Sequence, residues 1–361
     1  MTGRRTAAAI VMGALLALPG VAEAKTKKVN MGIPPSSSKA FQKLGLPIDV
    51  NDFFPHGVTI NRGDKVRFLP AGFHSFDLPP RGGDMIPLIS PTGEKVANSN
   101  DAAGAPFWFN GQDQVGFSQE LFPPGLFGKK ASYNGSKRVA SGLPLAEDLK
   151  PVTVTFKRTG RFTYFCNIHA GMKGTVTVRP KGKRVPSAKA DRKALKRQVA
   201  TALKTAKQLP KASAPANTIN VGAAGKHGEE LLAFVPSKVT VPTGTTLTFR
   251  MHPASFDVHT ATTGPGNPES EPNSYLGQIA ASFQSPAFDP RAVYRSEQPP
   301  NLATLTPASH GNGFWNSGVL DNDAGTPLAA ADRVTFGAPG TYDFYCMIHP
   351  FMKGTVTVTA P

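Results

Sequence analysis

Apolar and polar residues alternate over short stretches of this chain, a pattern that predicts β-strands with two unlike faces. In residues 161–166 the alternation puts Phe162, Tyr164 and Cys166 on one face, and residues 341–346 repeat the arrangement. After each of these strands come a short loop and a closing strand, at residues 174–178 and 354–358. Helical periodicity is scarce, and the chain has 36 Gly, 34 Pro and 23 Phe. We therefore expect an all-β protein with long loops.

The second half of the chain repeats the first at a constant offset of 180 residues near the ends of the two copies. The starts also correspond, because residues 53–63 align with residues 234–244 and an alternating strand follows each. Such a repeat indicates duplication of a whole domain. We expect domains at residues 25–180 and 217–361, joined by a connector at residues 181–216. The positions that recur at this offset are Thr155, Phe156, Gly160, Cys166, Ile168, His169, Met172 and residues 173–178.

The connector is predicted to contain a helix at residues 187–209, bounded by Pro186 and Pro210. An apolar stripe on one side would pack against one or both domains, and its amphipathic character would also suit a membrane surface. The residues of this stripe are Leu195, Val199, Ala202, Leu203 and Ala206.

The positive charge of the chain is concentrated around this connector. Residues 179–211 contain twelve Lys or Arg and one Asp, which gives +11 of the formal +16. No nucleic-acid-binding motif accompanies the segment, so we expect no nucleic-acid partner. Two interpretations remain open: a solvated basic linker, which is the commoner case, or contact with an anionic cell wall, lipid surface or acidic redox partner.

Residues 1–24 have the features of a signal peptide. Arg4 and Arg5 precede an apolar stretch, and residues 22–24 match the small-x-small form of a cleavage site. The stretch is too short to span a bilayer comfortably. We therefore expect cleavage near Ala24, an extracytoplasmic location (secreted, periplasmic or cell-surface), and no transmembrane span in the mature chain. No Cys follows residues 1–24 at a position where a lipid could be attached.

The two cysteines of the chain each begin the same set of side chains. Cys166 is followed by His169 and Met172, and Cys346 is followed by His349 and Met352. A thiolate, imidazoles and a weak axial thioether suit copper, because soft sulfur favours Cu(I) and imidazole tolerates Cu(II). The alternative is a disulfide between Cys166 and Cys346, but a disulfide does not explain the shared His and Met. We therefore predict two mononuclear copper sites.

Each site needs a second histidine from upstream. In the first copy His74 is the only histidine between Gly63 and Cys166, so it is selected by elimination. The second copy offers His252 and His259. We favour His259, because an alignment of His259 with His74 also places residues 80–82 near residues 264–266, and both segments are Gly- and Pro-containing turns. His56 is expected to be a surface residue, and His227 and His310 are expected in exposed loops.

These residues resemble the cupredoxin superfamily of plastocyanin and azurin, and the Cys-x2-His-x2-Met loop resembles that of amicyanin. The resemblance implies tandem Greek-key β-sandwiches and two type 1 coppers that cycle between Cu(I) and Cu(II). It implies a protein that carries single electrons between redox partners and is not an enzyme. The metal ligands are then His74, Cys166, His169 and Met172 in the first domain, and His259, Cys346, His349 and Met352 in the second.

The chain departs from small cupredoxins between the first His and the Cys of each domain, where both copies carry long Gly- and Pro-rich insertions. We expect ordered but irregular loops there. Each insertion holds one tryptophan, Trp108 or Trp315, and we expect both to pack over the metal sites.

Two other classes of function are weighed. A multicopper oxidase or nitrite reductase would have a copper between domains, held by His beside the Cys or by His-x-His pairs, and neither pattern occurs. A copper-delivery protein would be expected to use exposed Met- or His-rich clusters. Zinc is a weaker occupant, because a thioether binds it poorly.

Overall fold

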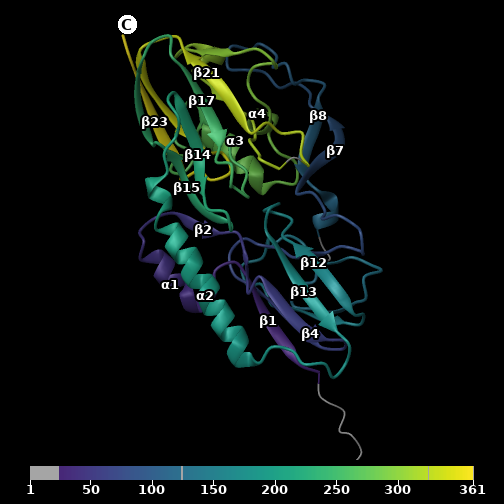
Figure 1. Ribbon diagram of the computed structural model, residues 1–361. Coiled ribbons are helices and arrows are strands. Elements are labelled where there is room, and N and C mark those ends of the chain that lie inside the picture. The colour runs from purple at the N-terminus through teal and green to yellow at the C-terminus, as the bar shows by residue number, and fades with distance from the viewer. Residues whose placement is uncertain (1–23, 123–124, 324, 361) are drawn as a thin grey trace, which may run out of the picture.

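The computed structural model describes residues 24–122, 125–323 and 325–360. It confirms an all-β architecture, with two β-sandwiches placed end to end and a long helix, α2 (Ala188–Ala206), along one side of both (Figure 1). The signal peptide predicted for residues 1–24 lies outside the described residues, except for Ala24. No helix in the described part of the chain has both the length and the apolar character needed to cross a membrane.

The first sandwich consists of two five-stranded sheets with a core of aliphatic and aromatic side chains between them. Phe68, Phe76 and Tyr164 are fully buried there, and the rings of Phe68 and Phe76 stack with centroids 4.2 Å apart. The strands in spatial order are β3 (Phe53–Phe54), β1 (Thr26–Met31), β5 (Lys65–Pro70), β11 (Val152–Phe156) and β9 (Lys130–Tyr133) in one sheet, and β10 (Val139–Ala140), β6 (Asp77–Leu78), β12 (Gly160–Phe165), β13 (Lys173–Arg179) and β4 (Gly57–Asn61) in the other.

The second sandwich has the same plan with six and five strands. Its core includes Phe249, Trp315 and Phe344, which pack against one another. The strands in spatial order are β19 (Ala303–Leu305), β21 (Ala331–Phe336), β17 (Thr246–Met251), β14 (Thr218–Ala224), β15 (Glu229–Val235) and β2 (Ile48–Val50) in one sheet, and β16 (Lys238–Pro242), β23 (Lys353–Thr359), β22 (Gly340–Tyr345), β18 (Thr262–Thr263) and β20 (Trp315–Asn316) in the other.

The duplication is visible in the strand register. β12 pairs antiparallel with β13, and β13 pairs parallel with β4; β22, β23 and β16 repeat both pairings. The alternation predicted for these strands holds, because Phe162, Tyr164 and Cys166 all point into the first core. Each cysteine therefore directly follows the end of a buried strand, at equivalent places in the two sandwiches.

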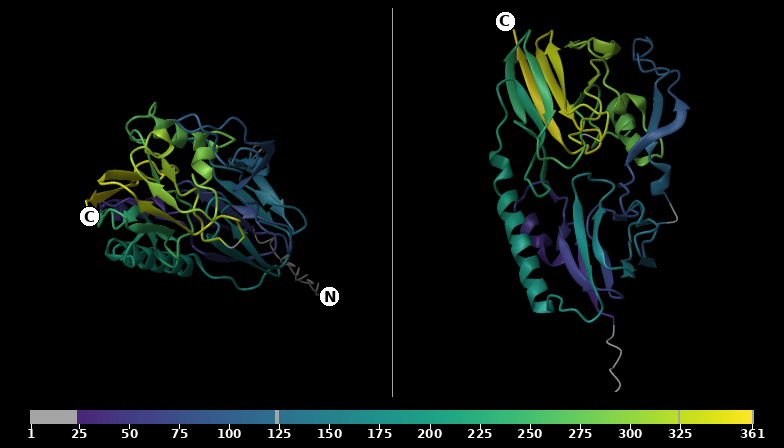
Figure 2. Two further views of the ribbon diagram at one scale, coloured as in Figure 1. Left: turned by 90° about the horizontal axis from the view of Figure 1, so that it is seen from above. Right: turned by 45° about the vertical axis from the view of Figure 1, so that its right-hand side comes forward.

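Two segments of the first half of the chain pack against the second sandwich. β2 adds an edge strand next to β15, with Val50 opposite Glu229. The hairpin of β7 (Ile89–Lys95) and β8 (Asp113–Phe117) lies against the second half, where Gly116 forms a bridge with Ala287. Figure 2 shows this hairpin beside the helices of the second half. The long insertion thus has regular structure where we expected irregular loop.

The predicted connector helix is confirmed, since α2 begins after Ser187, whose side chain accepts the Ala190 N–H. Its apolar stripe packs on Phe41, Val50 and Phe54. The remaining helices are α1 (Pro35–Gln42), α3 (Tyr275–Ala281) and α4 (Pro290–Val293), with 3-10 turns η1 (Gln119–Leu121), η2 (Leu209–Lys211), η3 (Ser282–Gln284) and η4 (Ser309–Gly311).

The two tryptophans do not share a role, so the expectation that both pack over the metal sites is wrong. Trp108 donates its ring N–H to the Arg295 carbonyl at 3.0 Å and packs edge-on against Tyr294, which joins the first insertion to the second half. Trp315 lies in strand β20 inside the second core. Similar local sequence thus occupies two different environments.

Candidate metal centres

The first group of predicted ligands converges at one end of the first sandwich. His74 follows β5, Cys166 follows β12, and His169 lies in the turn before β13. The Nδ1 atoms of His74 and His169 are 3.1 Å apart, and the Cys166 Sγ lies 3.6 Å from the His169 Nδ1. All three side chains are buried. The fold thus brings two imidazoles and a thiol together from two places, the segment after β5 and the loop between β12 and β13.

The second group repeats this geometry. His259 Nδ1 and His349 Nδ1 lie 3.2 Å apart, and the Cys346 Sγ is 3.7 Å and 3.8 Å from them. It is thus His259, and not His252, that the fold brings beside Cys346. Within the described ranges, these two groups are the only sets of three His, Cys or acidic side chains whose ligand atoms all lie within 4.8 Å of one another.

Both methionines belong to the same loops. In each copy the Met N–H donates to the carbonyl of the predicted ligand His on the same loop at 2.8 Å. The Cys N–H donates to the Met carbonyl, at 2.9 Å from Cys166 to Met172 and at 3.2 Å from Cys346 to Met352. The two methionine side chains are buried in the sandwich cores. Two backbone hydrogen bonds thus fix each loop that carries three of the four predicted ligands.

The donor set fits a copper ion. In each centre the Nδ1 atoms of the two imidazoles face each other and the thiol. The second ring nitrogen, Nε2, of His74 and of His259 is buried without a hydrogen-bond partner in the described structure. A trigonal His2Cys arrangement with a thioether nearby is the ligand chemistry of blue-copper electron-transfer sites. The side chains present therefore fit this ion better than zinc, which prefers ligands other than thioether.

The electrostatics of the metal-free centres favour a thiolate next to imidazolium. Burial would raise the pKa of the Cys346 thiol, but His259 and His349 outweigh burial and lower this pKa to about 5. Burial would also lower the pKa of His349, yet Asp257 and the Cys346 thiolate raise it to about 9. Cys166 and His169 shift in the same directions for the corresponding reasons. Each thiol is thus readily deprotonated, as metal binding requires.

A backbone N–H also points at each sulfur. Ser75 N lies 3.5 Å from Cys166 Sγ, and Thr260 N lies 3.3 Å from Cys346 Sγ. The hydroxyls of Ser75 and Thr260 accept the N–H of the residue after each Cys, at 2.9 Å and 2.8 Å. Sequence reasoning missed these two residues, although a hydroxyl residue follows the upstream His in both copies.

Glycines that were also missed hold the upstream imidazoles. A Cβ added to Gly32 would lie 2.6 Å from the His74 ring, and one added to Gly222 would lie 3.1 Å from the His259 Nε2. Both glycines have positive φ, 99° and 92°. The backbone therefore packs directly on each ring, which only glycine permits at this distance.

The other histidines lie outside the two groups. His56 is largely exposed, as expected, and pairs with Asp52. His252 lies in the loop after β17. His227 lies in the turn between β14 and β15. His310 is not in an exposed loop, and that expectation is wrong: its ring is largely buried between Asp101 and Glu297.

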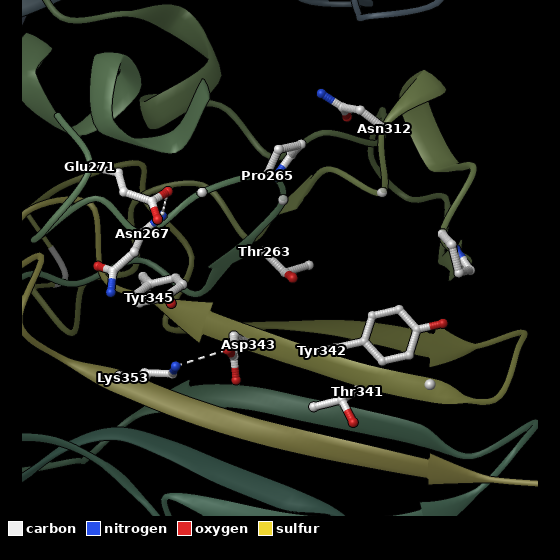
Figure 3. A pocket seen from close by; sticks show the side chains of 15 residues that line it. Thr263, Pro265, Asn267, Glu271, Asn312, Thr341, Tyr342, Asp343, Tyr345 and Lys353 are labelled. Atoms are coloured by element: carbon white, nitrogen blue, oxygen red, sulfur yellow. Dashed lines mark hydrogen bonds and ion pairs between the residues drawn. The ribbon is translucent and has the colours of Figure 1, made fainter. Parts of the chain in front are cut away.

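A solvent-open pocket of about 710 Å³ lies on the second sandwich. Lys353 and Asp343 form an ion pair at 2.8 Å on one side of the pocket. Figure 3 shows Glu271 on another side, the Tyr345 ring between Glu271 and the ion pair, and Tyr342 farther along the same strand. The lining contains none of the eight predicted ligands. This pocket is therefore separate from the metal centres.

The chain matches no protein-family model. It is 42% identical over 59 residues to amicyanin-alpha of Methylorubrum extorquens, a match that covers 15% of this chain and 50% of that protein. The match thus spans half the length of this curated relative.

Among solved structures, oxidised plastocyanin from Dryopteris crassirhizoma is 22% identical, with 39% of this chain and 99% of that chain covered and a TM-score of 0.21. A reduced Cu(I) form of an amicyanin mutant is 16% identical, with 42% and 89% covered and the same TM-score of 0.21. The fold assignment rests on strand order, register and the curated match. Together these show that the chain has a cupredoxin-like fold.

Proposed function

We propose that this protein carries single electrons between redox partners by means of two copper ions, one in each sandwich. The observation that carries the proposal is the duplicated convergence of two imidazole Nδ1 atoms and one thiol, with 3.1 Å and 3.2 Å between the paired nitrogens. Beside each group lies a buried methionine on the same loop. The amicyanin match supports it.

Copper bound there would supply reversible one-electron chemistry between Cu(I) and Cu(II). His74, Cys166, His169 and Met172 would hold the first ion. His259, Cys346, His349 and Met352 would hold the second.

The residues around each ion would keep the ligand geometry constant between the two oxidation states. The loop hydrogen bonds fix the Cys, His and Met backbone, and Gly32 and Gly222 support the upstream imidazoles. The N–H groups of Ser75 and Thr260 stabilise negative charge on each sulfur, which tunes the centre from outside the ligand shell. Burial keeps bulk water away from the imidazoles and thiols of both groups except His349, which is half-buried.

Export and a charged partner belong to the same proposal. Residues 1–24 would direct the chain out of the cytoplasm and be removed near Ala24. The exposed face of α2 carries five cationic side chains, which would contact an acidic redox partner or an anionic surface. These residues are Lys189, Arg192, Lys193, Lys196 and Arg197.

The test is the copper content and visible spectrum of the oxidised mature protein, with Cys166→Ser and Cys346→Ser as a matched pair. We expect two coppers and an intense thiolate charge-transfer band in the wild type, and one copper in each variant. Colourless protein, or protein without copper, would overturn the proposal. A variant that lost both coppers would show that the two centres depend on each other.

A further inference from the structure

A short segment of the second sandwich, residues 255–257, lies against the ligand loop of the first. The ring of Phe256 covers Gly171, which sits between His169 and Met172: a Cβ added to Gly171 would lie 2.1 Å from a Phe256 ring atom. Only a residue without a side chain allows this contact. The second domain thus caps the ligand loop of the first domain directly.

The segment is held rigidly in this place. The buried Glu230 carboxylate accepts the Phe256 N–H at 2.7 Å and the Ser255 hydroxyl at 3.1 Å. Close by, Asn51 of the first half donates its N–H to the Gly228 carbonyl at 2.7 Å, next to the pairing of β2 with β15. Phe256 is therefore a fixed cover and not a mobile loop residue.

The residue after Phe256 contacts the second centre. Asp257 is buried, with 6% exposure, and its Oδ2 lies 3.7 Å from the His349 Nε2. The segment that covers the first ligand loop thus also contacts an imidazole of the second centre.

The two centres differ in their access to solvent. His169 is buried beneath the second sandwich, whereas His349 is only half-buried. In the second ligand loop Phe351 takes the place of Gly171, and it is 45% exposed with its ring 6.0 Å from that of His349. The second ligand loop thus offers an outside donor an exposed phenyl ring beside a partly exposed imidazole, whereas the corresponding imidazole of the first loop is buried.

We infer that Phe256 seals the first centre, so that electrons reach it through the second centre, with His349 and Phe351 as the point of entry. This inference rests on the proposed function. An outside one-electron donor, a redox protein or metal complex, is oxidised as the second centre is reduced. One electron then passes from the second centre to the first, and no bond is made or broken and no proton moves.

The test uses the copper-loaded Cys166→Ser and Cys346→Ser proteins, which retain only the second and only the first centre. Bleaching of the thiolate band by hexaammineruthenium(II) is followed in a stopped-flow instrument. We expect the isolated first centre to be reduced about tenfold more slowly than the isolated second, a difference of about 1.4 kcal/mol in activation free energy. In the wild type both should bleach at the rate of the second. Equal rates for the isolated centres would overturn the inference but leave the electron-carrier proposal intact.

Phe256→Ala in the Cys346→Ser background should speed reduction of the first centre, whereas Phe73→Ala in the same background should not. Phe73 is exposed and precedes His74, so it represents the competing route into the first centre. Acceleration by Phe73→Ala alone would place the entry there and overturn the inference.

Hydrogen exchange of the metal-free protein tests the seal without copper. Peptides covering residues 166–172 should exchange more slowly than those covering residues 346–352, and Phe256→Ala should remove the difference. If the two loops exchange alike in the wild type, Phe256 does not seal the first centre, whether or not either site binds copper.

Discussion

His310 and Asp101 form an ion pair across the two halves of the chain, with 3.3 Å between the His310 Nδ1 and the Asp101 Oδ2. The other ring nitrogen, Nε2, lies 3.0 Å from the Glu297 carboxylate. Phe107 packs against the same ring with centroids 5.0 Å apart. His310 thus links the insertion of the first copy to the insertion of the second.

This link predicts a pH-dependent stability. Burial would lower the pKa of His310, but Glu297 and Asp101 outweigh it and raise the pKa above 6.5. A raised histidine pKa stabilises the folded state fully below pH 6.5 and loses that contribution as pH rises through the folded pKa. His310→Gln should therefore reduce the free energy of unfolding, by about 1 kcal/mol or less, mainly at acidic pH. Urea unfolding of the wild type and of His310→Gln, below and above pH 6.5, measures the difference in the free energy of unfolding. A difference that is the same at all pH values would contradict the predicted pH dependence.

Gly32 should be essential for the first metal centre. Gly32→Ala places a Cβ 2.1 Å from the Ala71 carbonyl oxygen and 2.6 Å from the His74 ring, so we expect loss of the first copper only. Gly63→Ala is the matched control, because Gly63 has a similar φ of 96° but no atom within 4 Å of an added Cβ. The control should cost about 1–3 kcal/mol from backbone strain and keep both coppers. Copper analysis of the two variants separates the steric effect from the strain.

The hydroxyl of Thr260 should matter to the second centre alone. Thr260→Val keeps the shape of the side chain but removes the acceptor of the Met347 N–H, now bonded at 2.8 Å. A buried N–H without a partner costs about 1–3 kcal/mol. We expect lower stability and a shifted thiolate band from the second centre, with the first unchanged; Ser75→Ala should do the reverse. Visible spectra recorded in the Cys166→Ser and Cys346→Ser backgrounds assign each change, and a shift of both bands by one variant would refute the independence of these contacts.

The parts of the structure that sequence reasoning reached are those specified by local patterns. Alternation predicted β12 and β22 together with the buried faces of Cys166 and Cys346, because side-chain period is a local property of a strand. The apolar stripe, bounded by Pro186 and Pro210, likewise predicted α2. His259 lies beside Cys346, as alignment with His74 suggested.

The parts that sequence reasoning missed depend on pairing between distant segments. Nothing in residues 48–50 indicates that β2 pairs with β15 of the second sandwich, because the partner of an edge strand is not specified by its own periodicity. Nothing in residues 255–257 indicates that Phe256 covers the first ligand loop, because the two segments are far apart in the sequence. His310 appeared exposed in its Gly-rich surroundings, since its acidic partners are far away or in another loop.

The metal-free second centre should show a thiolate at unusually low pH. The Cys346 pKa is lowered from 9.0 to about 5 and the His349 pKa is raised from 6.5 to about 9. The stability that the folded protein gains from the Cys346 thiolate is fully present above pH 9.0 and is lost as pH falls through about 5. The stability that it gains from the His349 imidazolium is fully present below pH 6.5 and is lost as pH rises through about 9. The thiolate and the imidazolium are both present between about pH 5 and about pH 9, so the pair stabilises the fold most in this range. Thiolate absorbance of metal-free Cys166→Ser, titrated against pH, should persist to about pH 5, and a midpoint near 9.0 would contradict the pairing.

The cationic face of α2 should produce salt-dependent binding to an anionic partner. Residues Lys193, Lys196 and Arg197 are exposed, while the opposite side of α2 packs on the first sandwich, so charge reversal there leaves the core intact. Replacing all three with Glu should abolish binding to phosphatidylglycerol vesicles or to an acidic redox protein, and binding of the wild type should weaken as salt rises, because exposed charges are screened. Lys65→Glu, on strand β5 of the first sandwich, is the control and should bind as the wild type does. Copper content reports whether the variants remain folded. Loss of binding to vesicles alone would identify a lipid surface as the partner, loss of binding to the acidic protein alone would identify a redox protein, and unchanged binding to both would mean that the segment is a solvated linker.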